Sequence, residues 1–230
     1  MTDKIQLVVF DMAGTTVSDN EDVAKAFREA FSLAGISVEI NRIQPLMGYH
    51  KPVAIRKLMA LLGRVTNDEE VERIHEDFKK VMIRFYQEDP QVRPMPGAED
   101  VFAWLQEQGI RVSLNTGFSR EIASVIINRF RWIEQGLVNH FIGSDEVEQG
   151  RPHAYMIKRL MELNGVSDPL DVAKVGDTAV DIEEGRSAGC RYLIGVTTGA
   201  CTEAELEKSY PTHIIDHLQE LPRIITRNGE

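Results

Sequence analysis

The chain has 230 residues, of which 43% are hydrophobic and 27% charged, the balance of an ordinary globular protein. Its length allows one large domain with a small insert, and its formal net charge of −10 argues against nucleic acid as a partner. The apolar run at residues 5–10 is too short for a signal peptide or a membrane span, so we expect a cytoplasmic protein that binds no membrane. Cys190 and Cys201 have neither metal-ligand spacing nor disulfide density, so we expect both to be reduced.

The first strand candidate is this apolar run, which ends in Asp11-Met12-Ala13-Gly14-Thr15-Thr16. A buried parallel strand of this kind delivers the residue after it to the end of a sheet. Asp11 is therefore a candidate nucleophile, although an ordinary strand end followed by a turn would look the same.

Residues 17–92 have helical periodicity and no strand signal. Apolar residues recur every three or four positions over 21–34, and Gly35 ends that helix. Pro45 opens a turn and helix that carries Met47, Gly48 and Lys51, and a further helix begins after Asn67. This pattern predicts a small helical cap inserted after the first strand.

Residues 93–230 alternate between strand and helix patterns, which predicts a doubly wound parallel sheet of the α/β class. We expect residues 1–16 and 93–230 to form a Rossmann-like core. The predicted strands are at 110–114, 140–143, 172–175, 192–196 and 213–215, and the helices at 98–108, 119–129, 153–163, 178–188, 202–208 and 218–226.

Three later stretches place polar groups at or just past predicted strand ends. Thr116 and Gly117 follow one strand, Arg151 is fixed before a helix by a proline, and Asp177 ends another strand with Asp181 one helical turn further on. Because active sites of open parallel sheets lie at the carboxyl ends of the strands, these residues are expected to lie near Asp11.

A nucleophilic carboxylate, a phosphate-binding hydroxyl, a cation and an acidic pair, in this order, resemble the catalytic set of the haloacid dehalogenase superfamily. The resemblance covers nearly the whole chain and implies a hydrolase in which Asp11 attacks phosphorus. It also implies that Thr116, Gly117 and Arg151 hold the phosphoryl group. Mg²⁺ would be held by Asp11, the backbone carbonyl of Ala13, Asp177 and Asp181.

Several residues narrow the resemblance to the phosphonatase group of that superfamily. Ala13 stands where most members have an aspartic acid that protonates the leaving group, and Arg151 stands where most have lysine. Met47-Gly48-Tyr49-His50-Lys51 resembles the phosphonatase cap motif, whose lysine forms a Schiff base with an aldehyde. The expected function is cleavage of the carbon–phosphorus bond of a small phosphonate through Asp11 and Lys51.

Other positions depart from the phosphonatase pattern. Ala54 stands where that group has a histidine that relays protons, Phe118 where it has tyrosine, and the position near Glu21 lacks its cysteine. Met47, Gly48, Gly117 and Phe118 are expected to contact the substrate. A phosphatase that acts on a small phosphate monoester without a Schiff base, or a non-catalytic protein that binds a phosphorylated ligand, remain alternatives. The resemblance also implies a homodimer formed through the cap.

Overall fold

The sheet forms the centre of the computed structural model, which describes residues 4–226. Residues 1–3 and 227–230 of the expected core lie outside the described residues. Within that range six strands form one sheet in the order β3-β2-β1-β4-β5-β6, and all neighbours pair in parallel. The strands are β1 (Leu7–Phe10), β2 (Arg111–Thr116), β3 (His140–Gly143), β4 (Val172–Gly176), β5 (Tyr192–Val196) and β6 (His213–Ile215).

Helices alternate with these strands, as the sequence predicts. The α-helices are α1 (Asp22–Leu33), α2 (Ile40–Ile43), α3 (Lys51–Leu61), α4 (Asp68–Glu88), α5 (Ala98–Glu107), α6 (Arg120–Phe130), α7 (Tyr155–Asn164), α8 (Ala179–Ala188), α9 (Glu203–Glu207) and α10 (Leu221–Thr226). Short 3₁₀ turns occupy Gln44–Leu46, Ser144–Glu146, Pro169–Asp171 and Leu218–Glu220. The predicted α/β class with a doubly wound parallel sheet is confirmed.

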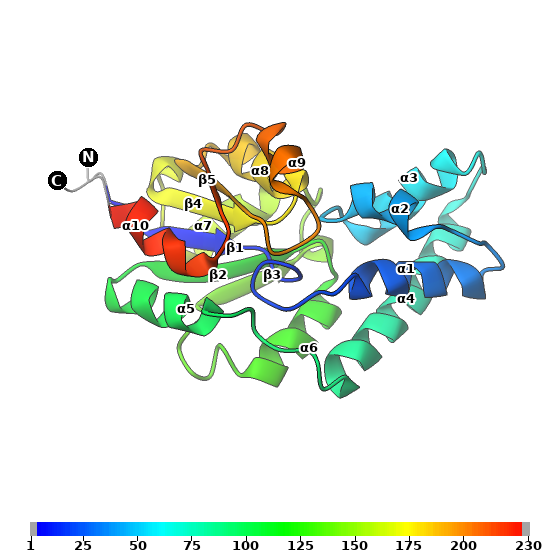
Figure 1. Cartoon of the computed structure of the whole chain (residues 1–230), viewed down its shortest axis with the longest axis horizontal. Helices are drawn as coiled ribbons and strands as arrows, with labels where there is room; N and C mark the ends of the chain where they lie inside the picture. Colours follow the sequence, from blue (N-terminus) through cyan, green and yellow to red (C-terminus); the bar gives the residue numbers. More distant parts are fainter. Residues whose placement is uncertain (1–3, 227–230) are drawn as a thin grey trace.

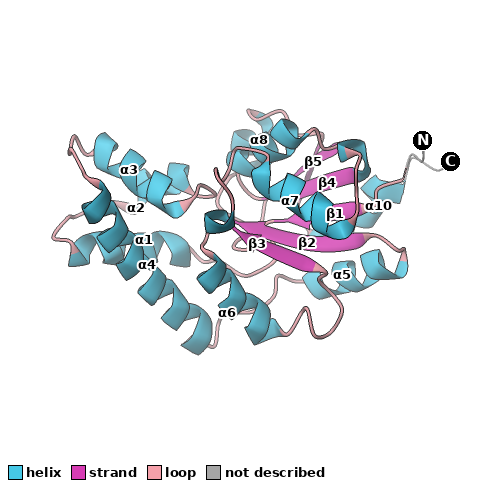
Figure 2. Ribbon diagram, turned by 180° about the vertical axis from the view of Figure 1, so that it is seen from behind, coloured by secondary structure: helices cyan, strands magenta, loops and turns pink. Residues whose placement is uncertain are grey.

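The two faces of the sheet bury different side chains of β1. Val8 and Phe10 belong to a core cluster with residues of α5 and α6, whereas Leu7 and Val9 belong to a second cluster with residues of α7 and α8. Figures 1 and 2 show these helices on opposite faces. Because successive side chains of a strand point to opposite faces, a strand buried on both sides reads as a continuous apolar run.

The helices α1 to α4, called the cap below, are grouped beyond one end of the sheet (Figure 1). Their apolar faces continue the core cluster that contains α5 and α6. The guanidinium of Arg129 in α6 also donates to the backbone carbonyls of Tyr86 (2.7 Å) and Asp89 (2.7 Å) at the end of α4. The assignment of residues 17–92 to a separate domain stays a prediction.

Two chain segments connect the cap to the sheet and lie side by side. The N–H of Ser18 donates to the carbonyl of Arg93 (3.0 Å), and the N–H of Met95 donates to the carbonyl of Thr16 (2.9 Å). The side chain of Ser18 also accepts from the N–H of Arg93 (3.1 Å). These bonds tie the outgoing and the returning segment together at the base of the cap.

The segment after Pro45 contains the turn and the helix that the sequence predicts. Met47 and Gly48 lie in the turn: the extended backbone of Met47 ends the preceding 3₁₀ turn, and Gly48 has a φ of +82°. Lys51 is the first residue of α3. Among residues 4–226 we find no helix whose length and hydropathy would let it cross a membrane.

Candidate active site

Asp11 lies directly after β1, at the carboxyl end of a central strand. Its backbone N–H donates to the carbonyl of Val175 in β4 (2.9 Å), and the residue is 6% exposed. The chain connects β1 to β2 on one side and later returns to β4 on the other, and ligands of open α/β sheets bind at such a switch in strand order. The hydrogen bond to β4 fixes the backbone from which the candidate nucleophile projects.

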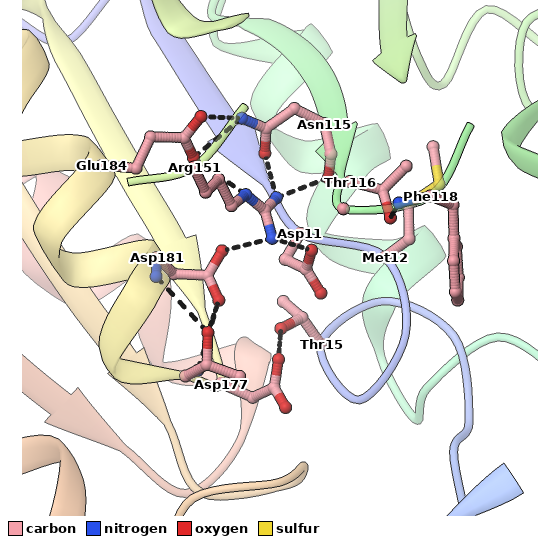
Figure 3. Close-up of polar contacts among 12 residues, drawn as sticks. Asp11, Met12, Thr15, Asn115, Thr116, Phe118, Arg151, Asp177, Asp181 and Glu184 are labelled. Carbon is pink, nitrogen blue, oxygen red and sulfur yellow. Dashed lines mark hydrogen bonds and ion pairs between the residues drawn. The ribbon is translucent and has the colours of Figure 1, made fainter. Parts of the chain in front are cut away.

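The buried Arg151 guanidinium contacts four residues through its three nitrogen atoms (Figure 3). Nη1 contacts Oδ1 of Asp11 (2.6 Å) and Oδ1 of Asp181 (3.0 Å). Nε donates to Glu184 (3.1 Å), and Nη2 donates to the backbone carbonyl (2.8 Å) and side-chain oxygen (2.5 Å) of Asn115. Arg151 thus holds Asp11 in place through a buried, charge-assisted hydrogen bond.

Three residues of this network were not found from the sequence. Lys174 in β4 contacts Asp181 (2.9 Å) and donates to the side chain of Asn115 (2.7 Å), whose amide in turn donates to Glu184 (2.9 Å). All three side chains are fully buried. Two of them carry a signal in the sequence, because Lys174 is a lysine inside an apolar strand and Glu184 lies three residues after Asp181, on the same helix face.

Asp11, Asp177 and Asp181 form a cluster that suits a divalent cation. One carboxylate oxygen of each lies within 4.8 Å of the others, and all three residues are buried. Thr15 donates to one oxygen of Asp177 (3.0 Å) and the N–H of Ala200 donates to the other (2.7 Å). An all-oxygen donor set with fixed orientation fits Mg²⁺.

The charges of these carboxylates are unequally compensated. Burial raises the pKa of Asp11, although Arg151 opposes the shift. Burial and the neighbouring charges of Asp11 and Asp181 raise the pKa of Asp177 well above its usual value. Burial also acts on Asp181, but Arg151 and Lys174 outweigh it and lower the pKa of that carboxyl. Asp11 and Asp181 each contact a cationic side chain, whereas Asp177 has no ion pair within the described residues.

Thr116, Gly117 and Phe118 form the loop at the end of β2, next to Asp11. The buried hydroxyl of Thr116 accepts a hydrogen bond from the N–H of Phe118 (3.2 Å) and keeps its own proton for another acceptor. Figure 3 shows Thr116 and Phe118 on the side of Asp11 away from Asp181. A phosphoryl group attacked by Asp11 would therefore lie close to the hydroxyl of Thr116.

The cap loop packs directly against the loops of the core. A Cβ atom on Gly117 would lie 2.5 Å from the carbonyl oxygen of Tyr49 and 2.7 Å from that of Gly48. A Cβ atom on Gly48 would lie 2.6 Å from the hydroxyl of Thr178. Only glycines at both positions allow this approach.

Lys51 begins α3 and is 3% exposed. Its ammonium nitrogen lies 4.9 Å from the ring centre of Phe118, 5.6 Å from that of Phe27 and 6.0 Å from that of Phe78. Burial lowers the pKa of Lys51 to about 8, although the carboxylate of Asp11 opposes the shift. The uncharged fraction of the amine at neutral pH is therefore larger than for an ordinary lysine, at roughly a tenth, and this form can act as a nucleophile.

One cavity collects most of the residues singled out from the sequence. It has a volume of about 30 Å³, enough for about two water molecules. Its lining contains Asp11, Ala13, Asp19, Val23, Met47, Gly48, Lys51, Thr116, Gly117, Phe118, Asp177, Thr178 and Ala200. Arg151 and Asp181 do not belong to this lining; Arg151 contacts both Asp11 and Asp181. Because this space is small, we expect the cap loop and the side chains of the lining to move when a substrate enters.

The fold and this constellation define the class of protein. A family model described as haloacid dehalogenase-like hydrolase matches residues 5–189, and the chain belongs to that family of hydrolases. The family resemblance inferred from the sequence is thereby confirmed.

Individual proteins are similar to the whole chain. The phosphonoacetaldehyde hydrolase of Bacillus cereus (strain ZK / E33L) is 28% identical over 243 aligned positions, which cover 98% of this chain and 90% of that protein. A phosphonoacetaldehyde hydrolase-like protein from Oleispira antarctica has a TM-score of 0.85 at 24% identity, covering 98% of this chain and 95% of that one. A hydrolase from Pseudomonas syringae has a TM-score of 0.86 at 20% identity, with coverages of 96% and 100%. At such identities the two structures show a shared fold.

Proposed function

We propose that the chain is a Mg²⁺-dependent hydrolase that cleaves the carbon–phosphorus bond of a small phosphonate aldehyde such as phosphonoacetaldehyde. The observation that carries this proposal is the buried amine of Lys51, which lines the same cavity as Asp11. The similarity to a phosphonoacetaldehyde hydrolase at 28% identity supports the same substrate class.

Asp11 would act as the nucleophile toward phosphorus. Arg151 holds its Oδ1, and within residues 4–226 its Oδ2 accepts no hydrogen bond. Attack by Oδ2 forms an oxygen–phosphorus bond while the carbon–phosphorus bond breaks, and water later hydrolyses the phosphorylated aspartate. Phosphorylation of Asp11 would weaken its bond to Arg151, which could then donate to the phosphoryl group.

Lys51 would make the carbon a leaving group. Its uncharged amine adds to the aldehyde carbon, the oxygen leaves as water, and an iminium forms. When the carbon–phosphorus bond breaks, its electron pair moves toward the iminium nitrogen and produces an enamine. No proton is delivered to the leaving group in this step, which agrees with an alanine at position 13 in place of an acid.

Mg²⁺ would be held by Asp11 and Asp177, with Asp181 next to them, and when bound it neutralises negative charge around the phosphoryl group. Thr116 would donate its hydroxyl proton to a phosphoryl oxygen. Closure of the cap excludes water, which strengthens each of these electrostatic contacts.

Phosphate release from phosphonoacetaldehyde with Mg²⁺, measured with and without borohydride, tests the proposal. We expect release from the wild type, inactivation by borohydride with substrate present, and loss of both in Lys51→Ala. Lys57→Ala is the matched control, because Lys57 lies exposed on the same helix with its ammonium over the ring of Tyr49. Absence of trapping in the wild type would contradict the Schiff base.

A phosphomonoesterase is the second candidate. The three aromatic rings around the ammonium of Lys51 favour its charged form, and a charged lysine would bind an anionic substrate rather than an aldehyde. Turnover of phosphate esters that survives Lys51→Ala would establish this function. Binding of phosphate esters without turnover, unchanged in Asp11→Asn, would point instead to a binding protein.

A further inference from the structure

Asp19 is a carboxylate of the cavity that the proposed reaction does not use. It follows the segment that leads from the core into the cap, and it lines the cavity together with Asp11 and Lys51. The cavity lining contains four titratable side chains, those of Asp11, Asp19, Lys51 and Asp177. Asp11 is the nucleophile and Asp177 a metal ligand, so Asp19 is the remaining acid.

One oxygen of Asp19 is bound firmly and the other is not. Oδ1 accepts hydrogen bonds from the backbone N–H groups of Asp22 (2.6 Å) and Val23 (3.2 Å), which belong to the first turn of α1. Within the described part of the chain Oδ2 accepts no hydrogen bond. The carboxylate is thus held in a fixed orientation by a helix start while one oxygen stays free to exchange a proton.

The surroundings of Asp19 favour such an exchange. Burial raises the pKa of the Asp19 carboxyl, and the neighbouring charge of Asp22 adds to this rise. The two backbone N–H groups and the charge of Lys51 lower the pKa, but by less. Asp19 in turn raises the pKa of Lys51, together with Asp11 and Asp177, whereas Arg151 lowers it. The two side chains therefore influence each other's protonation across the cavity.

Imine formation at Lys51 needs a group that moves protons between nitrogen and oxygen. The phosphonatase histidine expected three residues after the lysine is absent, because Ala54 occupies that position and is fully buried. His50 and Tyr49 follow Gly48 in the cap loop but do not line the cavity.

We propose that Asp19 is the general acid–base residue for imine formation at Lys51. The inference rests on the proposed function, because it requires an aldehyde substrate. The Asp19 carboxylate takes a proton from the Lys51 ammonium and returns it to the oxygen once the amine has added to the carbonyl carbon. It then takes the remaining excess proton from nitrogen and gives it to the hydroxyl, which leaves as water while the nitrogen lone pair forms the carbon–nitrogen double bond. In all, two protons pass from the ammonium to the departing water, and the carboxylate is regenerated.

The test compares the rate of borohydride trapping with phosphonoacetaldehyde in wild type, Asp19→Asn and Asp22→Asn under single-turnover conditions. An asparagine oxygen can accept the same two backbone N–H groups, so the helix start stays capped. We expect trapping at pH 9 to slow at least ~100-fold in Asp19→Asn, the lower range for loss of a general acid or base. Asp22→Asn, a change in the same turn outside the cavity lining, should trap at the wild-type rate.

A purely electrostatic role of Asp19 predicts a different result. Removing its charge would lower the pKa of Lys51 and shift the midpoint of the trapping rate to lower pH, with the plateau at high pH unchanged. The proposal requires that the plateau itself fall and that Asp19→Glu restore part of it. An unchanged plateau overturns the role of Asp19 while the Schiff base stands. No trapping in the wild type overturns the proposed function and this inference together.

Discussion

The ammonium nitrogen of Lys51 lies 4.9 Å from the centre of the Phe118 ring, so that a residue of the cap and a residue of the β2 loop meet across the cavity. Two effects act on this amine in opposite directions. Burial lowers its pKa to about 8, whereas the face of the aromatic ring stabilises the charged form.

The first prediction concerns the pH dependence of imine formation. Since the uncharged amine is the nucleophile, trapping should rise about tenfold per pH unit below pH 8 and level off above it. Phe118→Leu removes the ring, worth about 0.5–2 kcal/mol for a cation, and should shift the midpoint downward by roughly 0.4–1.5 pH units. Phe118→Tyr keeps the ring and should leave the midpoint in place. An upward shift in Phe118→Leu would contradict the contact's role.

The second prediction concerns Arg151→Lys. A lysine keeps one positive charge but cannot reach Asp11, Glu184 and Asn115 at once, because it lacks the guanidinium fork. Breaking a buried ion pair costs about 3–5 kcal/mol, so the free energy of unfolding should fall by about that amount. Turnover should fall with it, since Asp11 loses its orientation. Urea unfolding and phosphate release measure the two effects, and Arg159→Lys, at an exposed ion pair, serves as the control. Wild-type stability in Arg151→Lys would show that the network is not strongly coupled.

The sequence predicts the centre of the sheet well because β1 and β4 are buried on both faces and each is followed by a polar residue. Asp11, Thr116 and Asp177 could be placed from such strand ends alone. The role of Lys174 could not be predicted in this way, because periodicity indicates whether a residue is buried but not which charged side chains it contacts. Its partners Asn115 and Glu184 come from β2 and α8, so that their contact depends on the strand order.

The loop geometry of the cap was likewise beyond sequence reasoning. The close approach of the Gly48 carbonyl to Gly117 joins segments about seventy residues apart, and no local pattern in the sequence indicates it. A glycine in a sequence indicates a possible turn, but only the structure shows which backbone segment packs against it.

The third prediction concerns metal binding. Mg²⁺ added to the wild type should raise the melting temperature, because a ligand present at 100 times its Kd stabilises the folded state by about 2.7 kcal/mol. Asp177→Asn removes a ligand of the cluster and should abolish most of this rise. Glu183→Gln, an exposed change on α8, should retain it. Thermal unfolding followed by circular dichroism, with and without EDTA, measures the effect independently of activity. An equal rise in Asp177→Asn would place the metal elsewhere.

The fourth prediction tests the packing of the cap loop on the core. Gly117→Ala places a Cβ atom 2.5 Å from the carbonyl oxygen of Tyr49, so the cap cannot close as it does here. We expect kcat/KM to fall at least ~10-fold, since a misplacement of about 1 Å can cost 100-fold. Gly63→Ala also replaces a glycine, with a φ of +69° and nothing within 4 Å, and should lose stability but not activity. Steady-state kinetics with matched unfolding curves distinguish the two variants. Wild-type kinetics in Gly117→Ala would show that closure tolerates the extra atom.

The fifth prediction concerns His75, on the inner face of α4. Its side chain is buried, and neither ring nitrogen has a hydrogen-bond partner in the described structure. Burial, together with the charges of Lys79 and His50, lowers the pKa of His75 to about 4. Between pH 6.5 and pH 4 the unfolded chain therefore binds a proton that the folded chain does not, so stability contributed by this residue falls as the pH decreases.

At pH 5 this residue should cost the wild type about 2 kcal/mol relative to pH 7.5, because one pKa unit corresponds to 1.36 kcal/mol. His75→Leu replaces the ring by an apolar side chain that binds no proton, so its stability should fall less over the same interval by that amount. Urea unfolding at both pH values gives the difference, in which the contributions of the other titrating groups cancel. His153→Leu, an exposed change, should follow the wild type. If His75→Leu loses as much stability as the wild type between the two pH values, the ring of His75 accepts its proton in the folded state as readily as in the unfolded chain.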